Sequence, residues 1–266
     1  RIDDLDHPAR RILDVVSLPG SKLLRKDYSD YGISKSDNLV KKGGKGGGLL
    51  KECQKAAQFL GVGDYEIFLL PGEGYDPVVE MFEQPAILFP ISLAEFSALE
   101  QKVVTYMAMS QIRLSNFIPM RMSLTDFESF FVALVRIFNP VFGSEASSMK
   151  KMKELQAQME EEITGSQRKQ LEKLVKEYAD SPWFDIEEWH LKMKCTAYRV
   201  ALLGCGDIGT ILDAMKKREP ELKGVPLSSQ KAMRKAFMKN EVARDIAAFG
   251  LSDTFLDLWY KYLKVK

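Results

Sequence analysis

Histidine is almost absent from this sequence, which contains only His7 and His190. A hydrolytic zinc site of the common helical type needs two histidines one helical turn apart, so that both face the metal. His7 and His190 are far apart in the chain, so no helix can present such a pair. The scarcity of histidine excludes this class of zinc enzyme, and we interpret each lone histidine as a structural or solvated residue.

Cysteine is also scarce and lacks the spacing of a disulfide framework. Cys53, Cys195 and Cys205 are odd in number, and none has a second cysteine or a histidine at metal-ligand spacing. We therefore predict buried, unpaired thiols and no bound metal. A chain without a disulfide framework is typical of a reducing compartment, and we expect a cytoplasmic location.

Long apolar runs and an excess of one charge are missing as well. The longest apolar stretch, residues 86–93, is far shorter than the roughly 18–20 residues that a membrane helix requires. The chain has 38 Lys and Arg residues against 37 Asp and Glu residues, which leaves a net charge of +1. Because no global field would attract a polyanion, we expect neither membrane insertion nor nucleic-acid binding. The chain begins at Arg1 without a signal pattern, which is typical of a fragment of a longer protein.

The sequence does contain enough apolar material for a substantial core, since 45% of its 266 residues are hydrophobic. Residues 9–16 have helical spacing, and Pro19-Gly20 should end that helix. The glycine-rich residues 43–48 have almost no side chains to pack, which predicts a flexible linker. A phosphate-binding loop is the alternative for this stretch, but it lacks the Gly-Lys-Ser/Thr sequence and a preceding apolar strand.

A larger domain, residues 49–266, is predicted after the N-terminal helical segment and linker of residues 1–48. It begins with an amphipathic helix that Gly61 ends. Because everything after Ser92 has helical patterning, the predicted fold class is α+β and mostly helical, with a small sheet followed by a helical bundle. The three predicted strands, separated by glycine and proline, cover residues 66–70, 78–82 and 86–90.

Capping and turn residues between the helical segments predict the helices of the bundle. The first long helix is almost entirely apolar in its middle, and a capping box at residues 125–128 opens the second. Two charged amphipathic segments joined at Thr164-Gly165-Ser166 are typical of a helical hairpin at the surface. The predicted helices after the sheet cover residues 95–114, 125–138, 149–162, 167–178, 185–203, 208–217, 229–237, 242–249 and 254–263.

Residues 204–209 spell the G-x-G-x-x-G of dinucleotide-binding proteins, after four apolar residues. That fingerprint requires residues 200–203 to form a strand, and an acidic residue after a second strand roughly 20 residues on. The chain near that distance reads EPELKG at residues 219–224, and no apolar run precedes this stretch. Helical spacing continues through the four apolar residues, so we predict that Gly204 ends a helix and that Asp207 caps the next one.

Two short motifs carry a family likeness: CTAYRVALL at residues 195–203, followed by Gly206-Asp207, and LSDTF at residues 251–255. With the predicted order of helix, small sheet, long apolar helix and later helices, the chain resembles the gluzincin zinc peptidases of the CAAX-prenyl-protease kind. It is more similar to degenerate copies of that domain in large bacterial tetratricopeptide-repeat proteins, where a phrase like TANRAGLL precedes Gly-Asp. Tyr198 and Val200 depart from that phrase. The likeness spans most of the predicted domain.

This resemblance implies a zinc site whose ligands have been replaced. Active members carry H-E-x-x-H on the long apolar helix. Here Met107 and Gln111 take the two histidine positions, and Ala108 takes the position of the glutamate. The third ligand, a glutamate on a later helix, is replaced by Lys194, and Tyr198 stands in the place of an aspartate. A lysine roughly 4 Å from a cation would repel it by about 4 kcal/mol at intermediate dielectric.

Other catalytic signatures do not stand out. Asp185 and Glu188 are a pair of carboxylates, but at the start of a charged helix we expect them to favour the helix dipole. The G-x-S-x-G signature of serine hydrolases is absent. The resemblance thus implies a non-catalytic protein-interaction or scaffold module, derived from a zinc peptidase fold and acting within a larger protein or assembly. We expect no catalytic residue, no cofactor and no small-molecule ligand.

The expected partner is another protein or another domain of the parent chain. The segment with Phe117, Ile118 and Met120 is the first candidate interface, because such residues are enriched at interface cores. Residues 255–260 are a second candidate, for which core packing is the favoured interpretation. The alternative function is a nucleotide-binding protein or enzyme that uses the turn at residues 204–209.

Overall fold

Two separate stretches of chain build each of the two units of the structure. The computed structural model describes residues 7–24, 26–143, 149–181, 185–223, 225 and 229–265. The helical unit comprises Arg1–Arg25 and Ser115–His190, and the mixed unit comprises Lys26–Leu114 and Leu191–Lys266. The units meet after Arg25, Leu114 and His190, whereas the predicted boundary lies after residue 48.

Packed helices make up the helical unit. Its helices are α1 (Pro8–Leu24), α5 (Phe117–Arg121), α6 (Leu124–Arg136), α7 (Met149–Glu162) and α8 (Gly165–Ala179). α1 packs against α5, α7 and α8, and α6 packs against α7. Aromatic rings fill the core between them. Phe127 stacks on Trp189 with 5.6 Å between ring centroids, and Phe131 meets Tyr178 edge-on at 5.5 Å.

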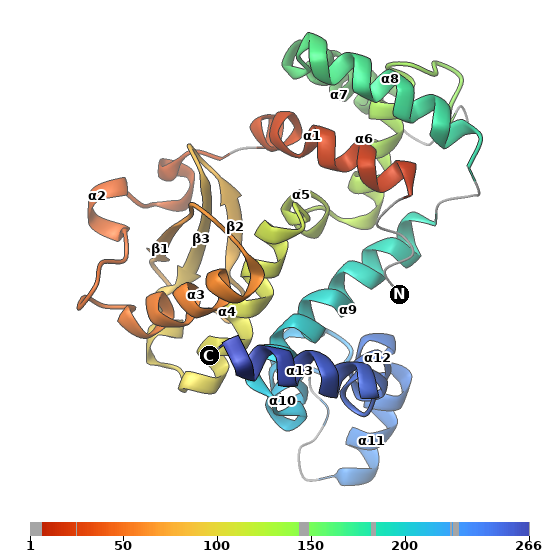
Figure 1. Cartoon of the computed structure of the whole chain (residues 1–266). Coiled ribbons are helices and arrows are strands. Elements are labelled where there is room, and N and C mark those ends of the chain that lie inside the picture. Colours follow the sequence, from red (N-terminus) through yellow and green to blue (C-terminus); the bar gives the residue numbers. More distant parts are fainter. Residues whose placement is uncertain are drawn as a thin grey trace. The chain divides into compact units, whose positions relative to one another are not determined.

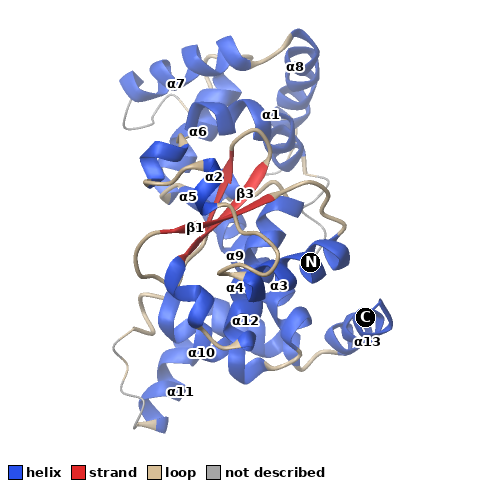
Figure 2. Cartoon of the chain, turned by 90° about the vertical axis from the view of Figure 1, so that its left-hand side faces the viewer, coloured by secondary structure: helices blue, strands red, loops and turns tan. Residues whose placement is uncertain are grey.

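Of the two charged helices, α7 has the predicted ends and α8 extends slightly beyond them at both ends, but the two do not pack as an antiparallel hairpin. Figure 2 shows them running in clearly different directions. Their apolar sides are buried against other helices, because α8 packs on α1 and Met152 of α7 joins a buried cluster with Val132 and Ala133 of α6. The amphipathic pattern predicted both helices correctly, whereas their packing partners were not predicted.

α1 continues through Pro19-Gly20, where the sequence analysis expected it to end. A proline at position 19 has no N–H to donate to the carbonyl of Val15. The side-chain amide of Gln167 donates to that carbonyl instead, at 3.4 Å. Gly20 permits close packing, since a Cβ on it would lie 2.9 Å from the ring of Phe130. Tertiary contacts therefore override the local helix-breaking signal.

The helix predicted from a capping box at residues 125–128 begins earlier in the chain. In α6 the capping residue is Ser123, whose Oγ accepts the backbone N–H of Asp126 at 3.1 Å. Thr125 lies inside the first turn, and its carbonyl accepts a hydrogen bond from Ser129 Oγ at 2.8 Å. Both positions offer a hydroxyl to the backbone, so the sequence could not distinguish them.

A three-stranded sheet is central to the mixed unit and confirms the predicted α+β, mostly helical class. The sheet has the order β1-β3-β2 (Figure 1), with β1 parallel to β3 and β2 antiparallel to it. The central strand is buried from Ala86 to Pro90, which explains why nearly all its residues are apolar. The strands are β1 (Glu66–Leu70), β2 (Val78–Met81) and β3 (Pro85–Pro90), preceded by the short helix α2 (Lys35–Asn38) and by α3 (Gly47–Leu60).

The glycine-rich residues 43–48 do not form the predicted linker between domains. The chain makes consecutive turns there, and α3 begins at Gly47. Gly46 has a φ of 81°, a left-handed conformation that favours glycine. A Cβ on Gly48 would lie 2.5 Å from Oε1 of Gln101, so this glycine allows a close approach to the next helix. Composition alone does not distinguish these uses of glycine from a flexible linker.

The long apolar helix α4 (Ala98–Arg113) packs against α3 and α10. α12 packs against α10, α11 and α13, so the C-terminal helices form one connected group (Figure 1). Within the described residues, no helix combines the length and hydrophobicity needed to span a membrane. The remaining helices are α9 (Ile186–Cys205), which begins in the helical unit and ends in the mixed unit, α10 (Ile208–Arg218), α11 (Gln230–Lys239), α12 (Glu241–Gly250) and α13 (Asp253–Val265).

The contact between α4 and α9 predicts a size limit at Gly204. A Cβ there would lie 2.5 Å from the ring of the fully buried Tyr106. We expect Gly204→Ala to lower the free energy of unfolding by at least about 1 kcal/mol, because overpacking outweighs the better helix propensity of alanine. Chemical denaturation followed by circular dichroism measures this change.

The matched control is Gly47→Ala in α3, where a Cβ would meet nothing within 4 Å. That variant should be neutral or more stable by up to about 1 kcal/mol. Equal effects of the two substitutions would contradict close packing of α4 on α9.

Candidate functional site

Two of the three positions on α4 that the resemblance assigns to the zinc site are core positions. Met107 is 3% exposed and Ala108 is fully buried. Gln111 is partly exposed. The carbonyl of Met107 accepts a hydrogen bond from Ser110 Oγ at 2.7 Å. This part of α4 therefore contributes to packing, with no ionisable side chain at any of the three positions.

Lys194 and Tyr198 lie one turn apart on α9, and both contact the carboxylate of Glu219. The Nζ of Lys194 lies 2.5 Å from Oε2 of the carboxylate, and the Tyr198 hydroxyl donates to Oε1 at 2.8 Å. Glu219 directly follows α10, and its N–H donates to the carbonyl of Met215 at 2.8 Å. These three side chains, here the Glu219 cluster, link α9 to the end of α10.

Because the Glu219 cluster is largely buried, loss of its contacts would cost stability. Tyr198 is fully buried and Glu219 is 2% exposed, so neither can exchange its partner for water. Burial raises the pKa of Tyr198, and the neighbouring Glu219 raises it further, against the opposing effect of Arg218. The phenol therefore stays protonated and serves as a hydrogen-bond donor to the carboxylate.

Two further cations at the end of α10 form ion pairs with other parts of the mixed unit. Lys217 forms an ion pair with Glu100 at the start of α4. Arg218 lies 2.8 Å from Asp76, in the loop that precedes β2. The Lys217 hydrogen bond is the main cause of a lowered pKa at Glu100. Together with the Glu219 cluster, these pairs connect the end of α10 to α9, to α4 and to the loop before β2.

The positions singled out by the resemblance thus fall into two groups. Lys194 and Tyr198 come together on Glu219, whereas Met107 and Gln111 form no hydrogen bond or ion pair with either of them in the described part of the chain. No three His, Cys, Asp or Glu side chains among the described residues lie together as a metal-binding group. Each member of the Glu219 cluster already has a partner, so the arrangement is suited to holding helices together.

Sequence reasoning missed the importance of Glu219. In the sequence it is only one residue of the 219–224 stretch, near the distance at which a dinucleotide site needs an acidic residue. Its contact with Lys194 joins residues 25 positions apart, on different elements. The available signal was a charged residue next to Pro220, directly after a helix with a basic last turn. Without the fold, this signal does not identify Lys194 as the partner.

The glycine-rich turn at residues 204–209 joins two helices. Residues 200–203 belong to α9, so the strand that a dinucleotide fingerprint requires is replaced by a helix. α9 ends one residue past Gly204, and Gly206 adopts the left-handed conformation with a φ of 69°. A Cβ on Gly206 would lie 2.8 Å from the indole of Trp259, so an aromatic side chain covers the turn. Asp207 caps α10 as predicted, accepting the Gly209 N–H at 3.1 Å.

The first candidate interface is largely buried. Phe117 is 3% exposed and Ile118 is 4% exposed, whereas Met120 remains partly exposed. Ile118 packs towards α1, since its Cδ1 would lie 3.1 Å from a Cβ on Gly20. The expectation that this segment offers an exposed apolar surface is therefore corrected for Phe117 and Ile118. Apolar composition predicts burial and interface formation equally well, and here core packing uses the residues.

The three cysteines are free thiols. Cys53 and Cys195 are buried, while Cys205 is partly exposed. Burial, followed by the nearby Asp245, raises the pKa of Cys195 to about 12, so this thiol is not a nucleophile at neutral pH.

Asp185 caps the start of α9. Its Oδ1 accepts the N–H of Glu188 at 2.9 Å, in line with the predicted role at a helix start.

The comparisons with known proteins add no family to this geometry. No family model, no curated protein and no solved structure matches the chain. The residues and their contacts therefore carry the functional argument.

A double-mutant cycle tests the Glu219 cluster. The side chain of Lys194 is 34% exposed and that of Glu219 only 3%. Lys194→Met leaves a buried carboxylate without its cation and should lower the free energy of unfolding by about 3 kcal/mol. Glu219→Gln leaves a cation that can reach water and should have a smaller effect, about 1–3 kcal/mol.

The double variant should be more stable than the sum of the single effects predicts, by at least about 0.5 kcal/mol. Urea denaturation of the four proteins gives the coupling. Additive effects, or a larger effect for Glu219→Gln than for Lys194→Met, would contradict the assigned roles.

Proposed function

We propose that the chain is a non-catalytic protein-interaction or scaffold module built on a zinc peptidase-like fold. It acts within a larger protein or assembly, and its partner is another protein or another domain of the parent chain. The observation that carries this proposal is the Glu219 cluster. The side chain at the position of the third zinc ligand, Lys194, is a cation engaged in a partly buried ion pair.

The electrostatics of this position support a structural role. A divalent cation near Lys194 would be repelled by the ammonium group and would have to compete with it for Glu219. The carboxylate also accepts the hydroxyl of the fully buried Tyr198, at 2.8 Å. Breaking this arrangement would leave buried polar groups without partners. The fold retains the charged centre as a link between helices.

An exposed apolar surface on α13 supports an interaction role. Phe255 is buried and packs against Phe249 with 5.6 Å between ring centroids. A different side of α13 leaves Leu256 44% exposed and Tyr260 60% exposed. These two residues lie one turn apart and so share a face of the helix. The same helix therefore packs with one side and offers apolar groups on another. The free thiols favour a reducing, cytoplasmic setting for the module.

Zinc analysis of the purified chain tests the proposal. We expect far less than one zinc per chain after exposure to excess zinc and gel filtration, because Lys194 is paired with Glu219. Stoichiometric zinc in the native protein would contradict the non-catalytic assignment. Nucleotide binding through the turn at residues 204–209 would also contradict it, if calorimetry gave micromolar affinity for NAD or ATP that Gly206→Val abolished.

Rebuilding the ligands tests the placement of the vestigial site. The variant Met107→His/Gln111→His/Lys194→Glu restores the ligand types that the resemblance implies, and it should gain zinc. The control Ala108→His/Ile112→His/Cys195→Glu shifts each ligand by one position and should bind none. If the first variant is folded by circular dichroism and still binds no zinc, these residues do not mark a former zinc site.

A further inference from the structure

The helix α11 carries an unusual local excess of positive charge. It contains four cations, and no acidic residue occurs between Glu221 and Glu241. Lys223, in the preceding turn, adds a fifth cation. The whole chain is nearly neutral, with a net charge of +1, so this excess is a local feature. The five cations, here the α11 basic surface, are Lys223, Lys231, Arg234, Lys235 and Lys239.

These cations are exposed and not neutralised by acidic neighbours. All five side chains are exposed, and none forms an ion pair with an acidic group among the described residues. The preceding helix differs, since Lys216 pairs with Asp213 and Lys217 pairs with Glu100. A surface that keeps several unpaired cations close together is complementary to an acidic partner.

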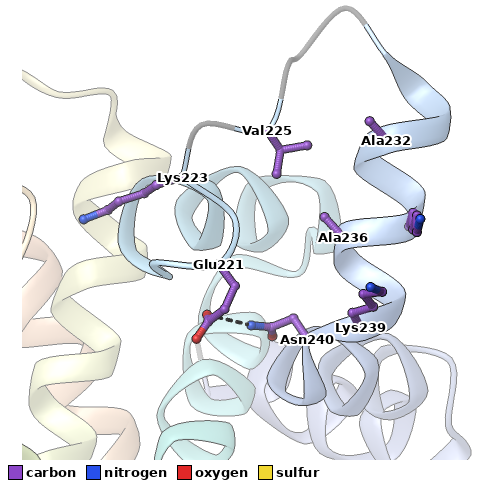
Figure 3. Close-up of a pocket in the computed structure, with 8 residues that line it drawn as sticks. Glu221, Lys223, Val225, Ala232, Ala236, Lys239 and Asn240 are labelled. Atoms are coloured by element: carbon purple, nitrogen blue, oxygen red, sulfur yellow. Dashed lines mark hydrogen bonds between the residues drawn. The ribbon is translucent and has the colours of Figure 1, made fainter.

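A pocket lies within the α11 basic surface. It has a volume of about 550 Å³ and opens between α11 and the turn that follows α10 (Figure 3). Apolar groups of Val225, Ala232 and Ala236 line it, and Lys235 and Lys239 belong to the same side of α11. Residues spaced three and four apart share a helix face, which explains why these alanines and lysines meet at one pocket.

One end of the pocket is held by a polar contact. Nδ2 of Asn240 donates to Oε2 of Glu221 at 3.3 Å (Figure 3). Oδ1 of Asn240 accepts the Ala243 N–H at 2.9 Å, which caps α12. Both polar ends of Asn240 are therefore engaged. Lys235 and Lys239 of α11 remain as the lining cations that can offer charge to a ligand, whereas the Lys223 side chain points away from the apolar lining (Figure 3).

The apolar lining and the neighbouring lysines together favour a partner with both an apolar group and negative charge. A pocket of this size can take one large apolar side chain, and the lysines can contact carboxylates on either side of it. Nucleic acid fits less well. No aromatic side chain lines the pocket, so bases cannot stack there, and charged phosphates would not bind its apolar lining. A short acidic peptide segment with an apolar anchor satisfies both features.

We propose that the α11 basic surface is a docking site for an acidic protein segment with a large apolar anchor residue. The anchor enters the pocket between Val225, Ala232 and Ala236, and flanking Asp or Glu residues contact Lys235 and Lys239. This site deepens the proposed interaction function and rests on it. It assigns the interaction to a place on the surface and to a chemical class of partner.

Fluorescence anisotropy with labelled synthetic peptides tests the site. The probe is a peptide of about twelve residues with one central Phe or Leu, flanked on both sides by Glu residues. The full chain should bind it, and replacement of every Glu by Gln should weaken binding at least roughly tenfold through the loss of several ion pairs. Replacement of the central residue by Ser should also weaken binding roughly tenfold or more, since the apolar anchor is lost.

Charge-reversal variants locate the site. Lys235→Glu/Lys239→Glu should weaken binding roughly tenfold or more, and Ala236→Trp should block the pocket without changing the charge. The matched control is Lys153→Glu/Lys169→Glu, which reverses two exposed lysines on α7 and α8 and should bind like the native chain. Circular dichroism verifies that each variant is folded.

Several results would overturn the proposal. They are no binding of the acidic peptides by the native chain, equal binding of the Gln peptide, and equal loss in the α7–α8 control. Binding of a DNA duplex that depends on Lys235 and Lys239, without peptide binding, would assign the surface to nucleic acid. These failures leave the non-catalytic assignment intact, whereas stoichiometric zinc would remove that assignment without altering the peptide result.

Discussion

A buried carboxylate, that of Glu219, is the constraint on which the mixed unit depends. At 2% exposure it needs partners within the protein, and Lys194 and Tyr198 of α9 supply them. The same stretch of chain holds Lys217 and Arg218, which pair with α4 and with the loop before β2. The end of α10 is therefore linked to α4, to α9 and to the loop before β2.

Local signals predicted most secondary structure, and tertiary contacts explain where they failed. Gly61 ends α3 and Asp207 caps α10 as expected, because each signal acts within one turn. The three strands follow from β-rich runs between turn residues. Pro19-Gly20 did not end α1, because Gln167 supplies the hydrogen bond that the proline cannot. Such a partner, far away in the sequence, leaves no mark in the local pattern.

The candidate site was predicted only in part, for a similar reason. The resemblance drew attention to Lys194 and Tyr198, which the structure brings together. Glu219 was not recognised, since its role depends on the fold placing the end of α10 beside Lys194 and Tyr198. The same limit applies to the α11 basic surface. Its charge was visible in the sequence, but the pocket between α11 and the preceding turn requires the fold.

Anomalous X-ray diffraction at the zinc edge tests the central claim most directly, with crystals of the full chain grown in the presence of zinc chloride. The account predicts no anomalous peak at Lys194, Tyr198 and Glu219, with the Lys194 ammonium in contact with the Glu219 carboxylate. A zinc peak at this place, with Glu219 as a ligand and Lys194 displaced, would contradict it.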